Sequence, residues 1–188
     1  MLLTRIAGPT VFPDLLAAAK EHLREDSTDQ DLLISGLIAA AVEMIGAMAG
    51  RVLFAETWTL AISGVTGDLV LPKSPVTAVT AISYYDAAGV SQAATVADFY
   101  LFKDADVATL RPKPGKAWPV AQDREDAISV SFTAGYAALP GALKAAMLLL
   151  IGHLYENRET VVVGMAPAEV PLAVHELVAV HRLGWVAG

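Results

Sequence analysis

The stretch LPGALKAAMLLLIGHLYENRETVVVG, residues 139–164, joins an uncharged run, a polar segment and three valines. Pro140 suits the first position of a helix, and the apolar residues after it recur at helical spacing, which predicts a helix to about Arg158. These apolar residues are Leu143, Met147, Leu150, Ile151, Leu154 and Tyr155. A membrane span needs about 20 apolar residues. The uncharged run is much shorter, because Lys144 precedes it and His153 follows it. The helix therefore belongs to a protein core or docks on a partner.

Two further helices are expected before it. Pro13 suits the first turn of a helix that continues to about Arg24. In the acidic break that follows, Thr28 and Asp31 have the relation of a capping box. The second helix is expected from Asp29 to about Ala49, with Gly50 as its C-cap. Its apolar residues form two stripes, which predicts burial on more than one side. The stripes are Ile34, Ile38, Ala41, Ile45 and Ala49, and Leu33, Leu37, Met44 and Met48.

From Glu56 the apolar residues recur at every second position, as they do in strands. Roughly six short strands are expected between residues 56 and 134, many of them joined as hairpins, and residues 113–119 read as a loop. A last helix begins at Pro171. Its apolar residues are Leu172, Leu177, Val180 and Leu183, with Trp185 close behind. The order helix, helix, sheet, helix, helix makes the chain α+β.

Composition argues against several classes of function. The chain has 188 residues, 55% of them hydrophobic, and a net charge of −7. A protein that grips nucleic acid needs a basic stripe, and the absence of cysteine excludes disulfides and thiolate sites. The N-terminus is a poor signal peptide because its one basic residue, Arg5, follows the leucines. We expect a soluble, cytoplasmic chain whose surplus apolar surface lies between subunits.

No sequence pattern is typical of a catalytic or cofactor site. His175-Glu176 lacks the second histidine of a zinc-protease motif, because Ala179 occupies that position. Glu156 and Glu159 fit a surface salt-bridge cluster better than a catalytic carboxylate pair. We therefore expect no enzymatic activity, no metal and no cofactor.

The aromatic residues Trp58, Tyr84 and Tyr85 are expected to pack in a sheet and not to stack on bases. A base-stacking platform needs basic residues around it, and none lies close to these aromatics in the sequence.

Four segments, taken together, cover nearly the whole chain. They are AAAKEHLREDSTDQDLLISGLIAAAVEMIGAMAGRVLFAETW (17–58), LPKSPVTAVTAISYYDAAG (71–89), FTAGYAALPGALKAAMLLLIGHLYENRE (132–159) and PLAVHELVAVHRLG (171–184). Each is weak alone, but in this order and spacing they resemble the head–tail connector (adaptor) proteins of long-tailed phages, prophages and gene transfer agents. The third segment is the most specific. The chain departs from the family pattern beyond Arg182.

The resemblance implies a small α-helical bundle of about four helices with a β-rich insertion between the second and third helices. It assigns residues 1–55 to the N-terminal bundle helices, 56–136 to the insertion, 137–160 to the third helix, and 161–188 to a C-terminal loop and portal-docking helix. It also implies a virion protein of the particle neck, made in the bacterial cytoplasm. About 12 copies would form a ring between the portal protein and the stopper or tail-completion protein. DNA would pass through this ring without sequence-specific binding, and no membrane would be involved.

Candidate partner-interface residues lie around the ends of the last two expected helices. They are Tyr155, Arg158, Val162, Leu177, Val180, Leu183 and Trp185. Arg158 is expected to make a charge-assisted contact, since a cation is favoured at a helix C-terminus. Two alternatives to a ring subunit stay open. One is a soluble, non-enzymatic module that binds a ligand or a protein through its β insertion; the other is a small enzyme with an unrecognised site.

Overall fold

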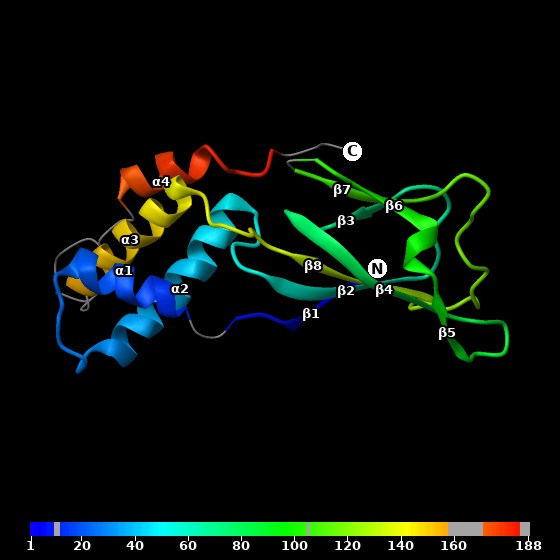
Figure 1. Ribbon diagram of the computed structural model, residues 1–188, viewed down its shortest axis with the longest axis horizontal. Helices are drawn as coiled ribbons and strands as arrows, with labels where there is room; N and C mark the ends of the chain where they lie inside the picture. The colour runs from blue at the N-terminus through cyan, green and yellow to red at the C-terminus, as the bar shows by residue number, and fades with distance from the viewer. Residues whose placement is uncertain (10–11, 105, 158–170, 185–188) are drawn as a thin grey trace, which may run out of the picture. The chain divides into compact units, whose positions relative to one another are not determined.

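A computed structural model describes residues 1–9, 12–104, 106–157 and 171–184 (Figure 1). Within these residues the chain is α+β, with four α-helices and two antiparallel sheets. It divides into two compact units. Met1–Gly8 and Phe54–Ala137 form the first, which contains the strands and is called the β unit below. Pro9–Leu53 and Ala138–Gly188 form the second, the helical unit.

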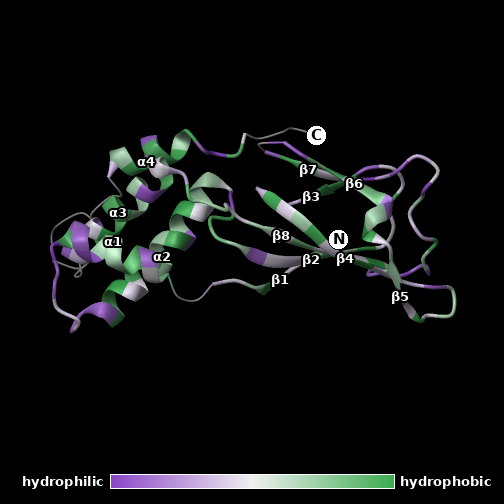
Figure 2. Ribbon diagram, viewed as in Figure 1, coloured by the Kyte–Doolittle hydropathy of each residue, from purple (hydrophilic) through white to green (hydrophobic). Residues whose placement is uncertain are grey.

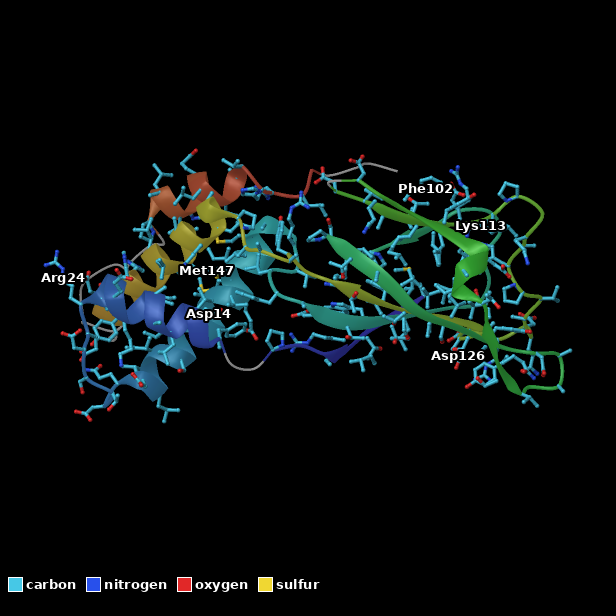
Figure 3. All side chains as sticks on the ribbon, in the orientation of Figure 1. Asp14, Arg24, Phe102, Lys113, Asp126 and Met147 are labelled. Carbon is cyan, nitrogen blue, oxygen red and sulfur yellow. The ribbon has the colours of Figure 1, made fainter. Side chains whose placement is uncertain are left out.

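The helical unit contains α1 (Pro13–Leu23), α2 (Asp31–Ala49), α3 (Gly141–Glu156) and α4 (Leu172–Ala179). Helices α2 and α3 pack on each other, and α1 and α4 each contact both of them. The most completely buried large side chains of this unit come from α2 and α3, and Met147, labelled in Figure 3, is one of them. These side chains are Ile34, Ile38, Ile45, Leu143, Met147, Leu150 and Ile151. The uncharged run of α3 is therefore part of the core of the helical unit.

Helix α2 is apolar along most of its length (Figure 2). Its first predicted stripe, from Ile34 to Ala49, is buried as expected. Its second stripe is not: Leu33 and Met44 are exposed, and Leu37 and Met48 are only half-buried. By length and composition alone, α2 could also cross a membrane, since it has 19 residues and an 18-residue window with a mean hydropathy of 2.0. The length limit that rules out a span in α3 therefore does not apply to α2.

Three helix starts differ from the sequence prediction, and one of them is α4, which begins at Leu172 with Pro171 as its N-cap. Gln30 is the N-cap of α2, and no side chain of the predicted capping box bonds to this end. Asp31 instead pairs with Lys20 of α1, with 2.6 Å between Oδ1 and Nζ. Helix α3 begins one residue later than predicted, so Pro140 is its N-cap. The predicted cap at Gly50 is confirmed: this glycine has a φ of +68° and ends α2.

The larger sheet of the β unit has the strand order β1-β2-β8-β4-β5. Its strands are β1 (Leu2–Ala7), β2 (Glu56–Ile62), β4 (Val76–Tyr85), β5 (Ser91–Ala94) and β8 (Ile128–Ala134). Every second residue of β8 is buried, which matches the predicted alternation. Strand β1 is a finding that the sequence did not predict. Residues 2–7 were placed with the N-terminal helices, but they pair with β2 over the register Leu2↔Ala61 to Ala7↔Thr57.

The smaller sheet has the order β3-β7-β6, with β3 (Leu69–Leu71), β6 (Phe99–Lys103) and β7 (Ala108–Pro112). A short 3-10 helix, η1 (Val96–Asp98), precedes β6. One face of this sheet is buried, through Phe99, Leu71 and Leu110.

Gly135 follows β8 and has a φ of +129°, a conformation that side-chain-bearing residues rarely adopt. Its amide donates to the Pro75 carbonyl oxygen at 2.8 Å. An added Cβ would overlap the carbonyl group of Phe54 and lie 2.8 Å from the backbone nitrogen of Ala55. The close approach of two backbone segments therefore requires glycine here.

Candidate functional site

Titratable side chains do not gather into a metal-binding cluster in the part of the chain that the structure describes. Of the four histidines, His22 and His175 are exposed, while His153 and His181 are half-buried in different helical segments. The exposed faces and helix ends of the described residues are the surfaces that this chain offers to a partner.

Tyr155 is the first of the predicted interface residues along the chain. Its hydroxyl makes hydrogen bonds to other residues of the helical unit. The hydroxyl oxygen is 3.0 Å from Gln30 Oε1 and 3.3 Å from Glu25 Oε2. These bonds tie the last turn of α3 to the connection between α1 and α2. Beyond Tyr155, Asn157 closes the helix end, because its side-chain amide donates to the His153 carbonyl oxygen at 2.8 Å. Arg158, Val162 and the predicted contact of Arg158 lie outside the described residues.

Helix α4 packs into the helical unit through its inner face, where Val174 and Val178 are buried. The chain after α4 is held at the end of α2: the Leu183 amide donates to the Ala49 carbonyl oxygen at 2.8 Å. Arg51 Nε donates to the His181 carbonyl oxygen at 2.5 Å. Residues 172–184 therefore belong to the packed helical unit and do not form a free arm.

The predicted interface residues of this segment differ in exposure. Val180 is 75% exposed, whereas Leu177 is half-buried. Leu183 is also half-buried. It lies close to Gly50, because a Cβ added at Gly50 would be 3.2 Å from the Cβ of Leu183. Trp185 lies outside the described residues. The structure thus leaves Val180 on the surface and engages Leu183 within its own chain.

The exposed face of the β3-β7-β6 sheet combines aromatic and basic side chains (Figure 3). Tyr100 and Phe102, 44% and 49% exposed, have ring centroids 5.8 Å apart. Lys113 Nζ lies 5.1 Å from the centroid of Tyr100, and Arg111 Cζ lies 5.1 Å from that of Phe102. At these distances each cation is attracted to the negative face of a ring.

Arg111 also forms a double hydrogen bond to Asp68. The hydrogen bond lowers the pKa of Asp68 below its usual value and raises that of Arg111. Asp68 therefore stays charged down to lower pH than an isolated aspartate, and the pair holds the Arg111 side chain on the sheet surface.

Cation–ring pairs also occur on the larger sheet, and here a sequence expectation was wrong. Lys73 Nζ lies 4.3 Å from the Trp58 ring centroid, and Arg124 Cζ lies 3.8 Å from that of Tyr85. These aromatics were expected to lack basic neighbours, because no basic residue is near them in the sequence. Antiparallel pairing and the loop after β7 bring the cations in from 15 and 39 positions away.

Comparison with solved structures finds a match over the whole chain. The neck of an empty gene transfer agent (GTA) particle, computed with C6 symmetry, contains a chain that is 26% identical, with a TM-score of 0.80. The alignment covers 100% of this chain and 98% of that one. The chain resembles a GTA neck protein from end to end.

Two further solved structures agree. One is the virion of a native GTA particle (TM-score 0.80), and the other is the neck of a native GTA particle computed with C12 symmetry (TM-score 0.78). Both matching chains are 26% identical, again with 100% and 98% coverage. No protein-family model and no curated protein matches the chain. The expected likeness to proteins of a phage-like neck is thus confirmed, and it favours a structural component of the particle.

Proposed function

We propose that this chain is a head–tail connector (adaptor) subunit of a tailed, phage-like particle. About 12 copies would form a ring beneath the portal and above the stopper or tail, extending the channel for DNA. The observation that carries the proposal is the likeness to a GTA neck chain over both units of the fold. A match confined to one unit would support only a shared domain, whereas this one covers 98% of the neck chain. The matched necks were computed with C6 and with C12 symmetry, which supports a ring and is compatible with about 12 copies.

The charge of the chain is compatible with a channel through which DNA slides. The helical unit carries 11 acidic and 6 basic residues, and the β unit carries 9 and 7. Neither unit has the basic excess of a protein that grips phosphates. We propose that DNA passes without sequence-specific binding.

A non-enzymatic role in the particle neck, without membrane insertion, completes the proposal. Although α2 is apolar enough to cross a membrane, its stripe from Ile34 to Ala49 is buried and it contacts the other three helices of its unit. Such packing supports the proposal that α2 is a core helix of a bundle and not a membrane span.

The portal contact is proposed for the exposed side of α4. Leu172 and Val180, both about three-quarters exposed, are available there, while Val174 and Val178 hold the helix on its own unit. The competing role is a soluble binding module, which has no need to self-assemble. Assembly therefore separates the two.

Removing the chain from cells that make the particle tests the proposal. We expect closed heads and free tails that no longer join, and restoration of joined particles when the chain is supplied again. Joined particles in normal number without the chain would contradict the connector role.

A further inference from the structure

The outer face of α2 is a largely apolar surface that the described residues leave exposed, with Glu43 as its one charged side chain. We define this face by its exposed apolar and small residues, which surround the exposed Glu43: Leu32, Leu33, Gly36, Ala39, Ala40, Met44 and Ala47. Leu32 is 88% exposed, and Leu33 and Met44 are 40% and 36% exposed. Only 28% of the 18-residue apolar window of α2 is buried. An ordinary surface helix carries charged residues on its solvent side, but between Leu32 and Ala49 the single charged residue is Glu43.

The chemistry of this face restricts what can cover it. It has no basic residue, so it does not suit a nucleic acid. Small residues dominate its middle, and a Cβ added at Gly36 would meet nothing within 4 Å. Such a surface lets another helix approach closely, because the distance between packed helices depends on the side chains at the contact. A protein surface with its own apolar residues is therefore the fitting occupant.

We propose that the outer face of α2 packs against a second copy of this chain, as a subunit–subunit contact of the ring. This inference rests on the proposed ring, because a closed ring requires every copy to bury a surface against its neighbour. It also accounts for the second stripe of α2, which the sequence predicted to be buried and which the single chain leaves partly exposed. Two other occupants are outcomes of the tests below: residues 158–170 of the same chain, and a lipid surface.

The first test places a charge on this face. Ala40→Glu should leave the isolated subunit folded, because Ala40 is exposed, but should weaken self-association at least tenfold, since a buried unpaired charge opposes the contact. Ala17→Glu is the matched control: Ala17 is also an exposed alanine in the middle of a helix, α1. Association would be followed by native mass spectrometry, alone and with the portal. Rings that form equally well from both variants would overturn the inference.

The second test identifies the occupant directly. The chain contains no cysteine, so Ala40→Cys carries a benzophenone photo-crosslinker at one defined place. Irradiation of assembled protein should give a product of twice the chain mass, and Ala17→Cys should give little of it. Label that reacts only within its own chain would assign the face to residues 158–170. Recovery of the labelled protein with vesicles of mixed phospholipids, without any dimer product, would assign it to a membrane. Either result overturns the inference.

The inference and the proposed function can fail separately. If the unmodified chain joins heads to tails but Ala40→Glu does so equally well, the connector role stands and the α2 contact is wrong. If the unmodified chain forms no ring alone or on the portal, the proposed function itself fails, and the photo-crosslink at position 40 is then expected to give no dimer.

Discussion

The role of α4 can be tested with two valines of similar position and opposite exposure. Val174 is fully buried in the helical unit, whereas Val180, just after the same helix, is 75% exposed. Val174→Ala removes two methyl groups, each worth about 0.8 kcal/mol of transfer free energy, and leaves part of a cavity. The free energy of unfolding should therefore fall by about 2 kcal/mol. In a chain of 188 residues this loss lowers the Tm by about 4–8 °C.

Val180→Ala is the matched control. It makes the same chemical change at an exposed site, so its effect on the free energy of unfolding should stay within about 0.5 kcal/mol. Thermal and urea unfolding, followed by circular dichroism, measure both variants. If Val180 contacts the portal as proposed, Val180→Ala should also reduce head–tail joining without a change in Tm. Equal, small Tm shifts for the two variants would show that α4 is not packed in the helical unit.

Three further predictions concern named contacts. Gly135→Ala should lower the free energy of unfolding by more than about 3 kcal/mol, because Gly135 has a positive φ and an added Cβ would overlap Phe54. Gly64→Ala is the control and should change the free energy of unfolding little, since nothing lies within 4 Å of the added Cβ. Comparable urea midpoints for the two variants would disprove the close approach at Gly135. The pKa of Asp68 is lowered from its usual 3.8, chiefly by the hydrogen bond from Arg111. This pair therefore stabilises the fold fully at pH values above 3.8, and the stabilisation is lost as the pH falls through the lowered pKa of Asp68. Stability measured from pH 6 to pH 2 should accordingly fall less steeply in Asp68→Asn, and parallel curves would count against the pair. Tyr155→Phe should destabilise the chain by about 1 kcal/mol, because it removes the hydroxyl that reaches Gln30 and Glu25; an unchanged urea midpoint would mean that these bonds are not maintained in solution.

The sequence predicted the helices and most strands of the β unit because their signals are local. Pro13 and Gly50 mark helix ends through backbone geometry, and the alternation in β8 follows from a strand with one buried face. Strand β1 lacks such a signal: its residues are mostly exposed, and only pairing with β2, at least 50 positions away, makes it a strand. The capping box failed for a related reason, since Asp31 has a tertiary partner in Lys20.

The surroundings of the candidate interface residues could be predicted less well than the fold. The sequence directed attention to the chain's C-terminal part, but Tyr155 and Leu183 make contacts within their own unit. The exposed stripe of α2 had been assigned to the core, because hydrophobic periodicity does not distinguish burial within a chain from burial between chains. The cation–ring pairs also depend on distant segments, as Lys73 on Trp58 illustrates.

A ring of this chain on its portal is the central claim, and cryo-electron microscopy of the purified chain mixed with the portal tests it most directly. We predict a closed ring of about 12 copies bound to one end of the portal, with a continuous axial channel. A chain that stays monomeric with and without the portal, and adds no density to it, would contradict this account.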